Sequence, residues 1–174
     1  VCVRRTTSLE KVVLPSTLNR IGVGAFYGCT KLKEINLENV QFINKEAFRN
    51  TALENVSLNS VSAIGTYAFA DSRIGYLKLP VSCQSLGAGA FYNNAYLDAV
   101  DISASRIKIG SYVFAECPRL TSIDINASVI PSYAFYNSTG LTSVTLGRDV
   151  SVIGEYAFAG TAVSQFKLNS ANTY

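Results

Sequence analysis

The 174-residue sequence contains no histidine, no methionine and no tryptophan. Without histidine, neither a Ser-His-Asp nor a Cys-His catalytic arrangement can form, and the most frequent general base of enzymes is missing. Since the sequence also lacks an initiating methionine and a signal-peptide pattern, we expect a processed mature form or a fragment of something longer. The missing histidine argues against an enzyme.

Charge and long apolar runs are also scarce. Only 16% of the residues are charged, and the net charge of +3 comes from bases that are interleaved with acids. This balance lacks the basic stripe that is typical of nucleic-acid binding. No run of ~18 apolar residues occurs, so the sequence predicts no membrane insertion. With 48% hydrophobic residues, the chain still has ample material for a continuous core.

What the sequence does contain is a repeat. An Xaa-Ala-Phe tripeptide recurs along the chain, with Val113 replacing the alanine once, and its phenylalanines lie 22, 21, 22, 23, 21 and 23 residues apart. Self-similarity at this period is typical of a solenoid, in which each repeat buries its apolar face only against its neighbours. The phenylalanines are Phe26, Phe48, Phe69, Phe91, Phe114, Phe135 and Phe158.

Two further motifs complete each repeat. A Leu-x-x-Ile-x-Leu pattern follows each phenylalanine by five or six residues, and the alternation of its last three positions is typical of a short strand with one buried face. An apolar residue followed by glycine comes next, as in Ile21-Gly22, and glycine there suits a tight bend with unusual backbone angles. We interpret Xaa-Ala-Phe itself as one helical turn whose phenylalanine joins an aromatic ladder in the core.

Together these motifs predict an α/β repeat solenoid. We expect a right-handed leucine-rich-repeat coil with a parallel concave β-sheet of eight strands, and short helical turns or strands on the convex side. Residues 1–8 are expected to form an N-terminal cap or the remnant of a preceding repeat. Residues 9–168 then form seven full repeats of 21–23 residues plus a partial eighth, and residues 169–174 a C-terminal tail.

The combined pattern closely resembles the BspA-like (treponemal-type) leucine-rich repeat. Its most recognisable stretch is Phe-Tyr-Gly-Cys-Thr-Lys-Leu at residues 26–32, and the resemblance covers about residues 9–168. The resemblance implies a cell-surface or secreted protein of the kind found in host-associated bacteria and protozoan parasites. It also implies adhesion through extracellular-matrix or other host proteins, with motif residues that are structural and no catalytic motif.

Strand positions that point away from the core form two columns down the predicted concave face. Because packing leaves these positions free to vary, they are the natural contacts for a ligand. An aromatic side chain beside charges of both signs, as in Tyr76 with Lys78 and Asp101, is typical of an interface anchor. The alternative is that these residues only keep the face soluble. The candidate partner-binding residues are Asn36, Tyr76, Lys78, Asp101, Asp124, Thr145 and Lys167.

Other polar groups receive simpler interpretations. Asp98, Asp101 and Asp124 form a small acidic cluster, but the sequence lacks the ligand spacing of a calcium loop, so we predict neither a metal nor a cofactor. Carboxylates on an open strand face also lack the concavity that glycoside hydrolysis needs. Glycosylation sequons begin at Asn55, Asn126 and Asn137, and they matter only in a eukaryotic secretory route.

Tyrosines flank the predicted turn in most repeats. They could line an aromatic strip for a ligand, although we favour the interpretation that they cover the turn of the next coil. The tyrosines concerned are Tyr27, Tyr67, Tyr92, Tyr112, Tyr133, Tyr136 and Tyr156.

The four cysteines show neither a CxxC pair nor a zinc-ligand spacing. Cys29 and Cys117 lie four repeats apart, roughly 19 Å at ~4.8 Å per strand, whereas a disulfide needs Cα atoms within about 7 Å. We therefore expect no bond between them. Cys83 falls where other repeats carry an apolar residue and is predicted in the core, while a bridge between Cys2 and Cys29 stays open.

The function expected from these patterns is a non-catalytic recognition module that binds a protein partner, or alternatively a glycan, through the concave sheet. The alternative from another class is a structural spacer or assembly subunit with end-to-end self-association, which the incomplete eighth repeat suggests. Neither a nucleic acid nor a membrane is an expected partner.

Overall fold

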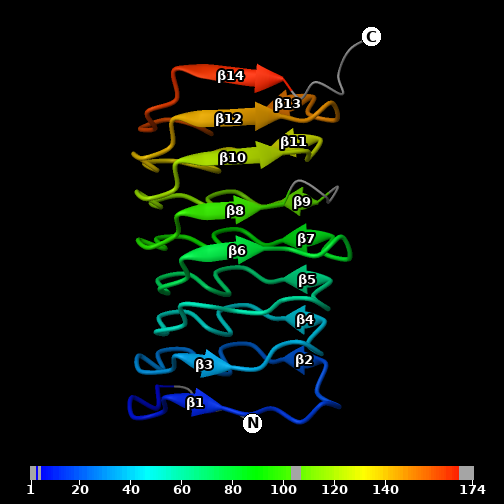
Figure 1. Ribbon diagram of the computed structural model, residues 1–174, viewed down its shortest axis with the longest axis vertical. Coiled ribbons are helices and arrows are strands. Elements are labelled where there is room, and N and C mark those ends of the chain that lie inside the picture. Colours follow the sequence, from blue (N-terminus) through cyan, green and yellow to red (C-terminus); the bar gives the residue numbers. More distant parts are fainter. Residues whose placement is uncertain (1–2, 4, 103–106, 169–174) are drawn as a thin grey trace.

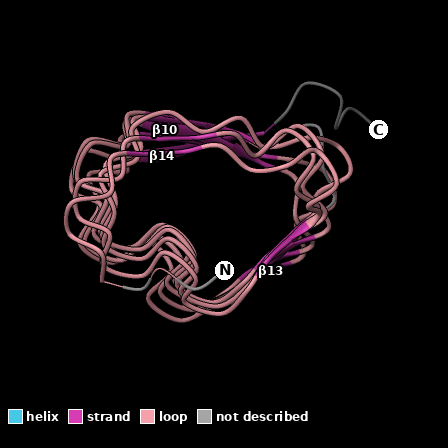
Figure 2. Cartoon of the chain, turned by 90° about the horizontal axis from the view of Figure 1, so that it is seen from below, coloured by secondary structure: helices cyan, strands magenta, loops and turns pink. Residues whose placement is uncertain are grey.

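The computed structural model describes residues 3, 5–102 and 107–168. Short parallel strands form two walls of a column of stacked coils, with the two described ends of the chain at opposite ends of the column (Figure 1). Seen along the axis, the coils superimpose and enclose one continuous core (Figure 2). The predicted solenoid is therefore confirmed. The column is nearly straight, so the face that was predicted to be concave is close to flat.

The first wall consists of the predicted Leu-x-x-Ile-x-Leu strands. Buried and exposed residues alternate along them, most completely in β10, because one face packs on the core and the other faces solvent. The copy at residues 53–58 forms no strand, so the wall has two parts. The strands are β1 (Lys11–Val12), β3 (Glu34–Ile35), β6 (Tyr76–Lys78), β8 (Ala99–Asp101), β10 (Ser122–Ile125), β12 (Ser143–Leu146) and β14 (Gln165–Leu168).

The second wall consists of two-residue strands that end at the apolar anchor before the glycine position. Each of these strands pairs in parallel with its counterpart in a neighbouring coil. The strands are β2 (Arg20–Ile21), β4 (Phe42–Ile43), β5 (Ala63–Ile64), β7 (Ser85–Leu86), β9 (Lys108–Ile109), β11 (Val129–Ile130) and β13 (Val152–Ile153). None of the described residues forms a helix that could span a membrane.

The predicted helical turn is wrong, and with it the α/β class, because the described residues contain no helix. In every coil the residue two places before the phenylalanine and the residue two places after it have a left-handed backbone, for example Tyr67 (φ 52°) and Asp71 (φ 57°) around Phe69. A right-handed helix cannot pass through such residues. Every second N–H of the turn instead bonds to the next coil, as Phe69 N does to Ala90 O at 2.8 Å.

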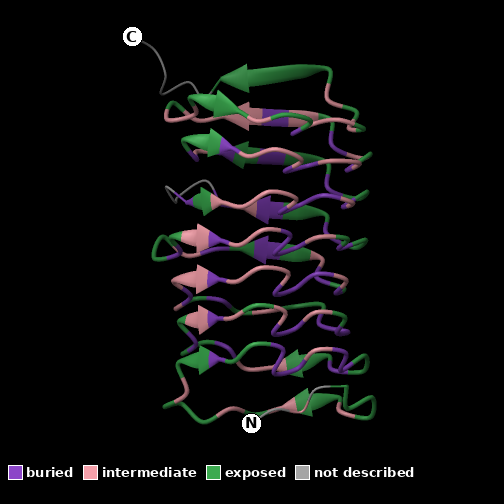
Figure 3. Ribbon diagram, turned by 180° about the vertical axis from the view of Figure 1, so that it is seen from behind, coloured by how far each residue is buried: buried purple, intermediate pink, exposed green. Residues whose placement is uncertain are grey.

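The predicted aromatic ladder is confirmed. Consecutive phenylalanine rings from Phe26 to Phe158 stack at centroid distances of 5.1–5.8 Å with interplanar angles of 4–19°. Those from Phe48 to Phe135 are completely buried. The residue before each ring, an alanine in six coils and Val113 in the seventh, is buried as well. The burial view shows the same pattern, with exposed residues most frequent in the first and last coils (Figure 3).

A buried polar side chain, three residues after the phenylalanine, ties most coils to the preceding one. It donates a hydrogen bond to the carbonyl oxygen of the preceding coil's phenylalanine. A buried carbonyl oxygen needs a hydrogen-bond donor, and this side chain supplies one. The pairs are Ser72 Oγ–Phe48 O (3.0 Å), Asn94 Nδ2–Phe69 O (2.8 Å), Cys117 Sγ–Phe91 O (3.4 Å) and Ser138 Oγ–Phe114 O (2.7 Å).

The cysteine predictions agree with this arrangement where the structure describes them. Cys117 is a free, buried thiol and is not bonded to Cys29, and burial raises its pKa to about 12. Cys83 is a free thiol in the core, as predicted, and burial raises its pKa to about 11. A bridge between Cys2 and Cys29 cannot be described, because Cys2 lies outside the described residues.

The glycines of the second wall serve a purpose different from the predicted one. None of Gly22, Gly65, Gly87, Gly110 and Gly154 has a φ in the left-handed region. A Cβ atom on Gly65 would instead lie 2.6 Å from Lys45 N and 2.7 Å from Asn44 C. Gly65, Gly87, Gly110 and Gly154 are therefore explained by the close approach of the preceding coil's backbone, whereas a Cβ atom on Gly22 would meet nothing within 4 Å.

Candidate functional site

The outward residues of the first wall lie in the predicted columns. Parallel pairing aligns Tyr76 with Ala99, Ser122, Ser143 and Gln165 on successive strands. It aligns the neighbouring column in the same way, from Lys78 to Lys167. We call the outward surface of the five-stranded sheet formed by β6, β8, β10, β12 and β14 the strand face. It presents a continuous set of side chains because the buried residues between them fix the register.

Five of the predicted partner-binding residues form one row across the strand face. They are Lys78, Asp101, Asp124, Thr145 and Lys167, one on each of the strands β6, β8, β10, β12 and β14. Lys78 Nζ lies 3.7 Å from Asp101 Oδ2, which makes a solvent-exposed ion pair of small energetic value. Tyr76 adjoins the row, with 50% of its surface exposed. The row therefore carries basic ends and an acidic middle, beside an aromatic ring.

Asn36 lies apart from this row, in the separate β1–β3 part of the wall. Its Oδ1 accepts a hydrogen bond from Leu14 N at 2.6 Å, and its Nδ2 donates one to Leu14 O at 3.0 Å. The half-buried side-chain amide of Asn36 thus bonds the backbone N–H and C=O of Leu14 in the preceding coil, as a neighbouring strand would do. Most of its bonding capacity is used within the fold.

The predicted acidic cluster is divided by an ion pair. Arg119 Nε lies 2.7 Å from Asp98 Oδ1, and Arg119 Nη2 lies 3.0 Å from Asp98 Oδ2. This two-pronged bond holds Asp98 beside Arg119, while Asp101 faces Lys78. Within the part of the chain that the structure describes, no three potential ligand side chains gather in a way that could hold a metal ion.

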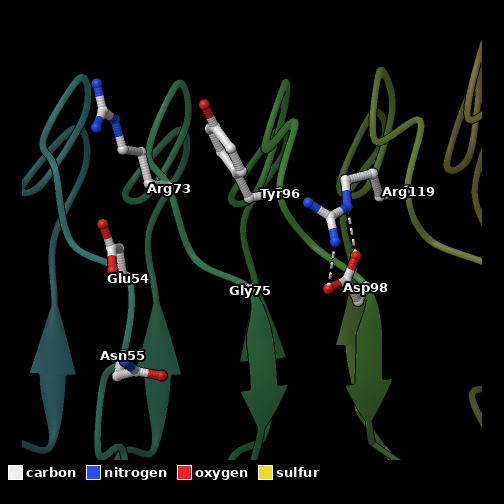
Figure 4. Close-up of a pocket in the computed structure, with 7 residues that line it drawn as sticks. All are labelled: Glu54, Asn55, Arg73, Gly75, Tyr96, Asp98 and Arg119. Atoms are coloured by element: carbon white, nitrogen blue, oxygen red, sulfur yellow. Dashed lines mark hydrogen bonds and ion pairs between the residues drawn. The ribbon is translucent and has the colours of Figure 1, made fainter.

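A hollow at the edge of the strand face was not predicted. It has a volume of about 380 Å³ and lies where the chain enters β6 and β8. Its lining includes Glu54, Arg73, Gly75, Tyr96 and Asp98, and Figure 4 shows Arg73 and Tyr96 projecting side by side from neighbouring coils. We call this hollow the edge pocket. The sequence signal that could have located it is Gly75, which stands where other repeats carry a polar side chain.

Three of the turn-flanking tyrosines, Tyr112, Tyr133 and Tyr156, stack on one another, and Tyr156 at the end of this stack keeps 60% of its surface exposed. The ring centroids of Tyr112 and Tyr133 are 4.7 Å apart, and those of Tyr133 and Tyr156 are 5.2 Å apart. Desolvation, followed by the neighbouring tyrosines, raises the pKa of Tyr133. Left-handed backbone costs roughly 1–2 kcal/mol for a residue with a side chain, and each stacked pair returns about 0.5–1.5 kcal/mol. These energies support the packing interpretation.

The three sequons differ in accessibility. Asn55 is exposed and lies at the edge pocket. Asn137 uses its amide nitrogen to bond Glu116 Oε1 at 2.9 Å, and Asn126 is half-buried beneath Gly147. Attachment of a glycan at Asn137 would replace an existing hydrogen bond.

Comparison with known families resolves the type of repeat. The sequence profile of the family described as the BspA type leucine rich repeat region matches residues 2–72 and 62–174, in six copies. The chain belongs to this family. The BspA-type repeat was thus predicted correctly from its motifs. Leucine-rich repeat proteins of this kind are generally non-catalytic binding modules, and their domains generally bind proteins.

Solved structures show the same fold. A leucine-rich repeat protein from Bacteroides ovatus superposes with a TM-score of 0.85 at 25% identity, over 92% of this chain and 43% of that one. The pneumococcal vaccine antigen PcpA gives a TM-score of 0.57 at 22% identity, over 95% of this chain and 52% of that one. The T. pallidum leucine rich repeat protein gives 0.55 at 23% identity, over 87% of this chain and 72% of that one.

The BspA-type chain therefore spans about half the length of the first two of these proteins. No curated protein sequence matches it.

Proposed function

We propose that this BspA-type chain is a non-catalytic recognition module whose strand face binds a protein partner. The observation that carries the proposal is the row from Lys78 to Lys167, which the strand register holds in a fixed order beside Tyr76. A rigid sheet presents these side chains without a backbone ordering cost on binding, and tyrosine supplies a large contact area at low entropy cost.

The chemistry of the row indicates what such a partner presents. The acidic middle at Asp101 and Asp124 suits basic side chains, while Lys78 and Lys167 at the ends suit acidic ones. Membership of the family supports a role at the cell surface or after secretion, in adhesion to extracellular-matrix or other host proteins. Asn36 contributes least, because its amide is bonded to Leu14.

The triple variant Tyr76→Ala, Lys78→Ala, Asp101→Ala is expected to bind such a partner at least tenfold more weakly, a loss of about 1.4 kcal/mol or more. The measurement is surface plasmon resonance against a set of immobilised extracellular-matrix proteins. The matched control is Gln84→Ala with Lys108→Ala, which alters exposed side chains on and beside the second wall. An unchanged affinity in the triple variant, with its circular dichroism spectrum preserved, would show that the strand face is not the binding surface.

End-to-end self-association is the second candidate function. The last described coil exposes apolar side chains, with Phe166 46% and Leu168 72% exposed, on a strand that has no described neighbour beyond it. Any further coil of the same repeat, from the same or another chain, would cover these residues. We expect sedimentation velocity to show concentration-dependent association that Leu168→Lys abolishes, and a strict monomer at every concentration would exclude this role.

A further inference from the structure

The edge pocket exists because one repeat lacks a side chain. Backbone hydrogen bonds link Gly75 to Glu54 on one side and to Asp98 on the other, so the three occupy equivalent positions in consecutive coils. The corresponding residues elsewhere are polar and bear side chains: Glu10, Lys33, Thr121 and Thr142. The gap at Gly75 therefore separates Glu54 from Asp98 and opens the hollow between them.

The backbone does not require glycine at this position. Gly75 has no left-handed φ, and an added Cβ would meet only Tyr96 O, at an ordinary distance of 3.7 Å. This sets Gly75 apart from Gly65, whose Cβ would collide with the preceding coil. The missing side chain at residue 75 consequently has no structural explanation in the fold, whereas it does create space.

The side chains around this space include a hydrogen-bond donor and an acceptor that have no side-chain partner within the described part of the chain. Three side chains occupy equivalent positions in consecutive coils: Arg73, Tyr96 and Arg119. Of these, Arg119 forms a bidentate ion pair with Asp98. Among the described residues, neither the Arg73 guanidinium nor the Glu54 carboxylate has a side-chain partner, although both line the pocket (Figure 4). Tyr96 lies beside Arg73 with 49% of its surface exposed.

We propose that the edge pocket binds a saccharide. A sugar hydroxyl both donates and accepts hydrogen bonds, so neighbouring hydroxyls can bond the donor Arg73 and the acceptor Glu54 together. The apolar face of a sugar ring can pack on Tyr96, whose ring is apolar and whose hydroxyl is polar. A simple anion would be opposed by Glu54, and a simple cation by Arg73. A second hollow of about 510 Å³ adjoins the first across Arg73 and Tyr96, which gives room for more than one sugar unit.

The experiment is a titration of the intact chain with methyl glycosides of glucose, galactose, mannose and N-acetylglucosamine, monitored by two-dimensional ¹H–¹⁵N NMR. Saturable shifts are expected at the amides of Gly75 and Tyr96 for at least one of the four sugars. Tyr96→Ala is expected to weaken binding of that sugar about tenfold. Gly75→Thr is expected to abolish it, because threonine already stands at the equivalent positions 121 and 142 and would fill the hollow without disturbing the coil.

Thr142→Ala, in the same column but outside the pocket, is the control and should bind as the natural chain does. The proposal is overturned if none of the four sugars gives saturable shifts at these amides, or if Gly75→Thr binds normally. It is also overturned if glutarate, a mimic of an acidic protein side chain, shifts these amides and the sugars do not. The outcome is independent of the strand-face experiment, because that experiment alters neither Arg73 nor Tyr96.

Discussion

Replacing Phe91 with alanine is expected to lower the free energy of unfolding by ~3–5 kcal/mol. The Phe91 ring is completely buried and stacks between Phe69 at 5.4 Å and Phe114 at 5.7 Å. Its removal would leave a cavity in the middle of the ladder, and the rings on both sides would lose a partner. The backbone around the gap cannot collapse, because the N–H groups of residues 89, 91 and 93 are bonded to the next coil.

Urea denaturation followed by circular dichroism measures this loss. The matched control is Phe158→Ala, at the end of the ladder, where the ring is only half-buried, stacks face to face on Phe135 and meets Phe166 edge to face. We expect a smaller loss there. Since coils of a solenoid can unfold separately, a second probe such as tyrosine fluorescence must report the same transition. A loss of less than ~1 kcal/mol at Phe91 would contradict the structural role of the ladder.

Replacing Gly65 with alanine is expected to lower the free energy of unfolding by ~1–3 kcal/mol, although the change adds only one methyl group. The added carbon would lie 2.6 Å from Lys45 N and 2.7 Å from Asn44 C, so two coils must separate. The hydrogen bond from Gly65 N to Ile43 O, 2.7 Å long, would lengthen. The column can accommodate a side chain at this position, because Asn44 occupies it in the preceding coil. The hydrogen bond there, from Asn44 N to Ile21 O, is longer at 3.1 Å.

Gly22→Ala is the control for this substitution. It has the same place in its repeat, but a Cβ there would meet nothing within 4 Å. Thermal unfolding should therefore leave Gly22→Ala within about 0.5 kcal/mol of the natural chain. If both substitutions were equally tolerated, close approach of the coils would not explain the glycines, and if both were equally harmful, the cause would be the backbone conformation of glycine.

The spacing of apolar residues was sufficient to predict the solenoid, the phenylalanine ladder and the columns of the strand face. These features depend on which residues are buried and at what period, and both are visible in a sequence. The turn was predicted incorrectly because tyrosine at residues 67, 112, 133 and 156 gives no sign of a left-handed backbone. The N–H groups of these turns bond to carbonyl groups of the next coil, 20–22 residues away, wherever a next coil follows, and such contacts leave no local sequence pattern.

The same limit applies to polar groups. Asn36 looked free to bind a partner because its bond to Leu14 joins two coils. Nothing within its own repeat distinguishes Gly75. Its role in opening the edge pocket is visible only when the stacking places Glu54 and Asp98 on either side of it. Burial follows from local pattern, whereas the partners of a polar side chain follow from the stacking register.

The inter-coil hydrogen bonds have a mechanical consequence. Hydrogen bonds of the turn join each coil to the next, and the strands of the two walls add further bonds that run along the axis of the column. A pulling force between the two ends is transmitted through all coil boundaries in series, so the weakest boundary opens first. The chain would lengthen in steps of one coil, and the remaining coils would keep their surfaces intact under tension.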